Sequence, residues 1–334
     1  MGFLRRLLGS KASAASSGST RDLSPLPLTW RDDTTMPIAD WEAARESGPP
    51  RGDDGAANTY WWRAAWTWVE ALRVHLGSAY AIEHSDNFVM LSPLTAKARQ
   101  LALAYCERSR RRILQSLQGV AASWGHGPHV VLIFDGQDAY YDYIGNYYPE
   151  RGEFAMSSGM FLQHGYGHFV FDASEPTTME PIIVHELTHC LLAPLPLPAW
   201  LNEGTAVNME KQLTPNWQDP RQGIFAHREH AKQRAKFWTA ATIQQFWSGK
   251  SFLRPDEGCS LSYDLAEELT RLIARDFDKY RAYMNAAHRN DAGEKAARAI
   301  LDFTLGDLAA AVLGPGEWAP DAKSWREGTE RGQF

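Results

Sequence analysis

The sequence predicts an α+β fold, in which a small sheet in the first half of the chain is followed by a mostly helical second half. Two observations lead to this prediction. Between residues 87 and 173, short apolar runs typical of strands surround one long amphipathic stretch typical of a helix. Beyond about residue 180, the apolar residues recur mostly at helical spacing.

The composition indicates a globular protein with a large core. The chain has 334 residues, of which 44% are hydrophobic, enough for one large domain or two modest ones. Its formal net charge of −6 argues against a nucleic-acid partner, which would require a basic surplus. The three cysteines form no CxxC pair and are odd in number, so we expect a reducing compartment rather than a disulfide framework.

The first residues show no targeting or membrane segment. The apolar stretch at the start is short and is interrupted by Arg5 and Arg6, unlike a secretory signal. No apolar window is long enough to span a bilayer. We therefore expect a soluble, cytoplasmic protein without a transmembrane segment. Residues 1–57 are rich in Ser, Pro, Gly and Asp, and they predict a flexible segment with one helical patch at residues 40–46.

The folded part is expected to begin with a Trp-rich helix at Asn58. This element, over residues 58–83, carries aromatic residues at helical spacing and is expected to pack on the domain. A strand at 87–92, a helix at 93–118 and a buried strand at 129–134 follow. The arginines of the helix, between residues 108 and 112, are interpreted as a solvated face.

A Tyr-rich stretch separates this unit from two further strand-like runs. Residues 140–152 are turn-prone, whereas EFAMSSGMFLQ (153–163) and GHFVFDA (167–173) have strand character. The Tyr-rich stretch is expected to form a loop that either covers the mouth of the substrate cleft or packs on the surface of the domain.

The segment IIVHELTHCLL carries the strongest indication of chemistry. His185 and His189 are four residues apart, so on an α-helix both imidazole rings lie on one face, one turn apart. Their nitrogens can then bind one Zn²⁺ at about 2.0–2.1 Å. Glu186 lies roughly 100° round the helix, beside the metal, where a general base for a metal-bound water belongs.

A third ligand is expected from the next helix, because a catalytic zinc has three protein ligands and one open position. Three prolines end the first helix, and PAWLNEGTAVNMEKQL begins a second one near Trp200. Glu203 lies in its first turn, within reach of the two histidines. Two neutral histidines and one carboxylate leave the zinc site positively charged, which lowers the pKa of a bound water toward about 7.

The pair HELTH and PAWLNEG resembles the gluzincin metallopeptidases, specifically the bacterial peptidase MA-like domains. The resemblance covers residues 84 to about 290 and is strongest at the two zinc segments. It implies a thermolysin-like (zincin) domain over residues 84–334, with a small twisted sheet, an HExxH active-site helix and a helical C-terminal lobe. The α/β part extends to about residue 193 and the helical part starts at about 199. By position, His185, His189 and Glu203 match the ligands of one Zn²⁺ per chain, and Glu186 matches the base.

The sequence departs from related patterns at two points. No GAMEN-type segment is present to hold a free amino terminus, so aminopeptidase activity is not predicted. Val207 stands where thermolysin has a carboxylate that supports a histidine ligand. We expect this support from another group, with Asn208 or a backbone carbonyl as the candidates.

Peptide hydrolysis also needs a hydrogen-bond donor for the oxyanion, which forms when the hydroxide attacks the amide carbonyl. Tyr263 lies near an expected helix start, where gluzincin-like domains often carry a tyrosine, and it is the first candidate. His227 and His230 are alternatives, although a surface role suits their polar surroundings. Cys190 follows His189 directly and is expected to be a small core residue rather than a fourth ligand.

The sequence thus predicts a zinc-dependent metallopeptidase that hydrolyses peptide bonds with a metal-activated water. Its partner would be a peptide or protein substrate, lying along an edge strand formed by EFAMSSGMF (153–161). The alternative is a non-catalytic or regulatory peptide-binding protein with a zincin fold and a structural zinc. The intact Glu186 favours the enzyme, because a structural zinc needs no base.

Overall fold

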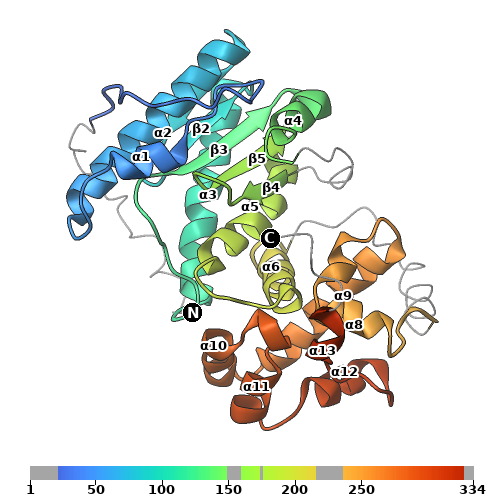
Figure 1. Ribbon diagram of the computed structural model, residues 1–334. Helices are drawn as coiled ribbons and strands as arrows, with labels where there is room; N and C mark the ends of the chain where they lie inside the picture. Colours follow the sequence, from blue (N-terminus) through green and yellow to red (C-terminus); the bar gives the residue numbers. More distant parts are fainter. Residues whose placement is uncertain (1–21, 149–158, 174–175, 216–235, 327–334) are drawn as a thin grey trace, which may run out of the picture.

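The computed structural model of the protein describes residues 22–148, 159–173, 176–215 and 236–326. In these residues a five-stranded open sheet with mixed strand directions is followed by a helical region (Figure 1). The predicted α+β class, with the sheet first and the helices after it, is therefore confirmed.

The sheet has the strand order β1-β2-β3-β5-β4. The three central strands run parallel, and the two outer strands pair antiparallel with their neighbours. Strand β4 thus forms one edge of the described sheet. The strands are β1 (Ala81–His84), β2 (Phe88–Ser92), β3 (His129–Phe134), β4 (Gly159–Leu162) and β5 (His168–Asp172).

Helices cover both faces of the sheet. On β2, Phe88 and Met90 belong to the core under α3 and α5, whereas Val89 and Leu91 belong to the core under α2 and α4. The alternation follows from the two-residue period of a strand and explains why the central strands are apolar throughout. These helices are α2 (Asp54–Leu76), α3 (Ala96–Ser116), α4 (Gly136–Ile144) and α5 (Pro176–Leu192).

The described part of the N-terminal segment packs on the protein, which differs from the flexible segment expected over residues 1–57. Helix α1 (Trp41–Glu46) forms at the predicted helical patch, and the side chain of Trp41 is buried. Its ring meets that of Trp68 edge-on, with 5.1 Å between centroids. Trp62 and Trp68 of α2 are themselves buried, so these Trp side chains of α2 pack in the core, as expected.

Two elements were not predicted from the sequence. Strand β1 was missed because it is short and only half-buried. Its sequence therefore does not have the apolar run that is typical of a central strand. Helix α4 covers the start of the Tyr-rich stretch, because Tyr140 and Tyr143 lie on one face and are fully buried, and the expected turns follow at residues 145–147. Burial of these aromatic rings at helical spacing stabilises a helix more than the turn-prone composition disfavours it.

The arginines of α3 are partly or fully exposed, as interpreted from the sequence, but two of them also bind groups on neighbouring helices. Arg108 forms an ion pair with Glu180 of α5. Arg112 Nη1 donates to the backbone oxygen of Leu213 at 3.0 Å. Helix α3 is therefore tied to both helices that follow the sheet.

The helical region packs closely around α6 (Ala199–Leu213). Gly204 allows this packing, because a Cβ at this position would lie 2.2 Å from the backbone oxygen of Ala266 on α9. None of the helices in the described ranges has the length and apolar character to cross a bilayer. The remaining elements are α8 (Thr242–Trp247), η1 (Lys250–Leu253), α9 (Glu257–Ile273), α10 (Phe277–Ala286), η2 (Arg289–Asp291), α11 (Glu294–Ala296), η3 (Ala297–Leu301), α12 (Leu305–Leu313) and α13 (Ala322–Arg326).

Candidate metal centre

Helices α5 and α6 bring the two predicted metal segments together. Apolar side chains of α5, such as Ile183, Leu187 and Leu191, are buried and fix the helix against the sheet. The helix ends at Leu192, and the proline-rich connection reverses the chain so that α6 begins directly after Pro198. The predicted helix–reversal–helix arrangement is confirmed.

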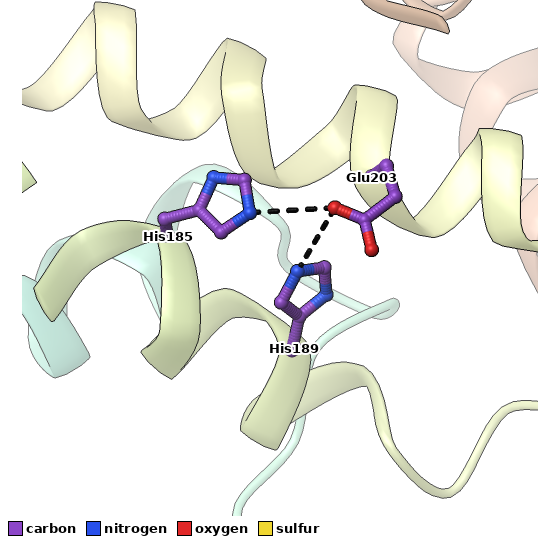
Figure 2. Close-up of side chains that lie close together, drawn as sticks. All are labelled: His185, His189 and Glu203. Carbon is purple, nitrogen blue, oxygen red and sulfur yellow. Dashed lines mark ion pairs between the residues drawn. The ribbon is translucent and has the colours of Figure 1, made fainter. Parts of the chain in front are cut away.

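Three side chains from these helices point toward one another (Figure 2). Glu203 Oε2 lies 3.3 Å from His185 Nε2 and 3.3 Å from His189 Nε2. One potential ligand atom from each residue lies within 4.8 Å of the other two, a group that can hold a metal ion. The side chains are 14–21% exposed, so the group is shielded but still reachable from solvent.

The geometry and the state of Glu203 fit a metal ion. Two atoms bound to one Zn²⁺ at tetrahedral angles lie about 3.3 Å apart, as the carboxylate oxygen and each imidazole nitrogen do. Glu203 Oε2 is buried and has no hydrogen-bond partner among the described residues, although two imidazole nitrogens face it. A buried carboxylate oxygen without a donor is costly, and a cation between the three side chains removes this cost.

The electrostatics of the group favour a positive charge at its centre. Burial raises the pKa of Glu203, but both histidines oppose it and hold that pKa well below its usual range. Burial lowers the pKa of His185, yet the carboxylates of Glu203 and Glu210 on either side of the ring outweigh it and raise the pKa to about 10. In the metal-free protein a proton on His185 therefore supplies the charge that a metal ion would bring.

Glu210 is part of this centre, although it was not among the residues predicted from the sequence. Its Oε2 lies 3.3 Å from His185 Nδ1 and is hydrogen-bonded to it. Such a carboxylate orients a metal-binding imidazole and raises its basicity. Glu210 follows Glu203 by about two helical turns and so lies on the same face of α6. This spacing between Glu203 and Glu210 is the feature of the sequence from which Glu210 could have been predicted.

Asn208 was predicted to support a histidine ligand, but its side chain forms hydrogen bonds to backbone groups of two helices. Its Nδ2 donates to the backbone oxygens of Gly204 and Glu267, at 2.7 and 3.0 Å. It therefore joins α6 to α9 rather than orienting His185. His189 Nδ1, in turn, is buried and without a hydrogen-bond partner in the described part of the chain.

Glu186 lies beside the three potential ligands without belonging to their group. Its Oε2 accepts a 2.8 Å hydrogen bond from the backbone N–H of Phe161 on strand β4. Burial raises the pKa of Glu186 above its usual value, whereas His185 and His189 oppose this rise. A buried carboxylate of raised pKa next to a group that can hold a metal ion has the properties of a proton acceptor. The sequence contained no signal for its contact with Phe161.

The ring of Tyr263 lies near that of His185. Its ring centroid lies 6.3 Å from that of His185. The charge of Glu203, together with burial, raises the pKa of Tyr263 well above its usual value, so the phenol keeps its proton. Helix α9 begins at Glu257, earlier than the helix start expected near Tyr263.

Among the other candidates of the sequence analysis, Cys190 does not join the group. Cys190 is 3% exposed, and its Sγ lies 3.7 Å from His129 Nδ1 on the sheet side of α5, so it is a core residue as predicted. His227 and His230 lie outside the described residues.

No protein-family model matches the chain, and no curated protein matches it. The resemblance to gluzincins therefore stays a prediction from the two metal segments.

Proposed function

We propose that the protein is a zinc-dependent metallopeptidase of gluzincin type. The observation that carries the proposal is the convergence of His185, His189 and Glu203 on one point, with the carboxylate oxygen 3.3 Å from each imidazole nitrogen. A set of two imidazoles and one carboxylate is typical of catalytic zinc, which keeps a position open for water or substrate. When bound, the ion polarises a water molecule and the substrate carbonyl and lowers the pKa of the water.

Glu186 acts as the general base of this reaction. Its carboxylate is buried next to the ligands but makes its one described hydrogen bond to a backbone N–H, not to a ligand. It takes a proton from the attacking water and passes it to the amine that leaves when the peptide bond breaks. A carboxylate whose pKa is raised is suited to both steps.

Tyr263 supplies the hydrogen bond for the oxyanion. The phenol stays protonated because the charge of Glu203 and burial both oppose its ionisation. A protonated donor fixed on a helix, beside a histidine ligand, can stabilise the negative charge that develops on the substrate carbonyl oxygen.

Strand β4 is the proposed docking site for the substrate. It is the last strand on its side of the described sheet, and one of its residues contacts Glu186. An extended peptide can pair with such an edge through main-chain hydrogen bonds, with little demand on its sequence. Residues 153–158 of the predicted edge segment lie outside the described residues.

A non-catalytic protein with a structural zinc is the alternative. Structural zinc sites are closed by four protein ligands. Among the described residues, only His185, His189 and Glu203 gather at this point. The buried carboxylate of Glu186 has no role in such a site, so we favour the enzyme.

Metal analysis and peptide cleavage together test the proposal. The purified wild type should hold one zinc per chain and cleave members of a mixed peptide library. His185→Ala should lose the metal, whereas His126→Ala, which removes a half-exposed histidine from another part of the protein, should keep it. Glu186→Gln should keep the metal and lose cleavage. A wild type that holds zinc but cleaves no peptide would support the structural alternative.

A further inference from the structure

We infer that strand β4 positions the general base: the backbone N–H of Phe161 anchors Glu186 Oε2, which leaves Oε1 for the attacking water. The inference rests on the proposed function, since it assigns a task in the same reaction. It adds a group from the sheet to a site otherwise built from helices.

The anchoring contact is a short, well-placed hydrogen bond. The distance from the Phe161 nitrogen to Glu186 Oε2 is 2.8 Å. A backbone N–H has a single proton, so this donor is directed at the carboxylate rather than at the neighbouring strand β5. Because β4 is the last strand on its side of the described sheet, its outward N–H groups have no strand partner there.

Strand β4 is held against α5 at a second point. A Cβ added to Gly159 would lie 2.8 Å from Ile182 Cγ2 and 2.4 Å from the ring of Phe171. Only glycine therefore allows the strand to lie so close to the helix at this position.

The two contacts are equally spaced along strand β4 and helix α5. Gly159 and Phe161 are two residues apart on a strand, which spans about 6.6 Å. Ile182 and Glu186 are four residues apart on one face of a helix, which spans about 6 Å. The strand thus runs alongside α5, with Gly159 against Ile182 and the N–H of Phe161 against Glu186. The side chain of Phe161 secures this arrangement by packing on Phe169, at 4.9 Å between ring centroids.

This arrangement limits the freedom of the base. A glutamate side chain has three rotatable bonds, and an unanchored carboxylate near a cationic centre can turn toward the cation and become a ligand. The hydrogen bond holds one oxygen away from that centre. The other oxygen makes no hydrogen bond to the described residues and is available to accept a proton. A fixed acceptor lowers the entropic cost of reaching the reactive geometry.

Amide hydrogen exchange tests the anchor without any need for activity. In the metal-free and the zinc-loaded full-length chain, the amide of Phe161 should exchange at least about tenfold more slowly than an open edge amide. Glu186→Ala should abolish this protection and leave the amide of Phe169 unchanged. A Phe161 amide that is unprotected in the wild type, or still protected in Glu186→Ala, would overturn the inference.

Replacing the amide by an ester tests the catalytic task. Phenyllactate at position 161 removes only the N–H. We expect kcat to fall roughly 10- to 100-fold, with KM within about twofold and the zinc content unchanged. Phenyllactate at Phe277 is the matched control, because the N–H in the first turn of helix α10 has no helical partner.

The outcomes separate the two proposals. A rise in KM at constant kcat would mean that this N–H binds substrate instead of the base, and an unchanged kcat and KM would mean that it does neither. If the wild type cleaves no peptide, the proposed function fails, and hydrogen exchange still decides whether Phe161 anchors Glu186.

Discussion

Glu210 and Glu203, about two turns apart on one helix, contact the two nitrogens of the same imidazole. Glu203 Oε2 lies 3.3 Å from Nε2 of His185, and Glu210 Oε2 lies 3.3 Å from Nδ1. The ring is thereby held between two carboxylates, and its orientation is set before any metal binds. Only one of the two carboxylates belongs to the group that can hold a metal ion.

Removal of the Glu210 carboxylate should weaken metal binding without abolishing it. Glu210→Ala leaves Nδ1 of His185 without its acceptor, so the ring becomes less basic and less well oriented. We expect the affinity for zinc to fall about 10- to 100-fold, measured by competition with a chelator. Glu317→Gln, which changes an exposed carboxylate far along the chain, should leave the affinity unchanged. Equal affinities for wild type and Glu210→Ala would contradict this role.

Tyr263→Phe should separate catalysis from metal binding. The substitution removes one hydroxyl, so zinc content and stability should stay close to those of the wild type. If the phenol stabilises the oxyanion, kcat should fall about 100- to 1,000-fold with little change in KM. Tyr283→Phe removes another buried hydroxyl, one without a hydrogen-bond partner among the described residues, and should not affect kcat. A Tyr263→Phe variant with full kcat would rule out the proposed donor.

Gly204→Ala should disturb both stability and the site. The new Cβ would lie 2.2 Å from the backbone oxygen of Ala266 and 2.3 Å from Thr270 Oγ1, so α6 and α9 must separate. Overpacking of this kind costs about 1–3 kcal/mol of unfolding free energy, or more where backbone atoms clash. Chemical denaturation should show this loss, whereas Gly55→Ala, at an open position of α2, should be neutral or slightly stabilising.

Removal of the metal should make stability depend on pH above neutrality. The pKa of His185 rises from 6.5 to about 10 in the folded, metal-free protein. The folded state then binds more protons than the unfolded state, so this stabilisation is complete below about pH 6.5 and is lost as the pH rises toward about 10.

Thermal unfolding checks this pH dependence. The melting temperature of the chelator-treated protein should fall as the pH rises from about 6.5 toward about 10. His185→Gln should flatten the slope in metal-free samples. A melting temperature of the metal-free wild type that stays constant between pH 7 and 10 would show that His185 gains no stabilising proton.

Much of the fold was predictable because its signals are local. The HELTH helix, the proline-rich reversal and the helix after Pro198 each follow from residues adjacent in sequence, and the structure has them as predicted. Strand β1 was missed because its stability comes from pairing with β2 rather than from its own apolar residues. Helix α4 was missed because burial of its tyrosines outweighs local turn preference.

The contacts that complete the site could not be predicted in the same way. Phe161 meets Glu186 through its backbone, so its side chain gives no indication of the contact. Arg108 and Arg112 resemble surface residues in sequence, yet they bind groups on α5 and α6. Such pairings depend on the relative placement of elements, which residue spacing does not reveal.

The short connection between α5 and α6 lets the three potential metal ligands come together early in folding. All three potential metal ligands lie in one pair of consecutive helices, so the loop that must close to bring them together is small and its entropic cost is low. Phe161, which contacts Glu186, and Tyr263, whose ring lies near that of His185, come from more distant parts of the chain. Contacts of low sequence separation form faster. A metal ion can therefore be captured by the helix pair early in folding, before the sheet edge and α9 pack against it.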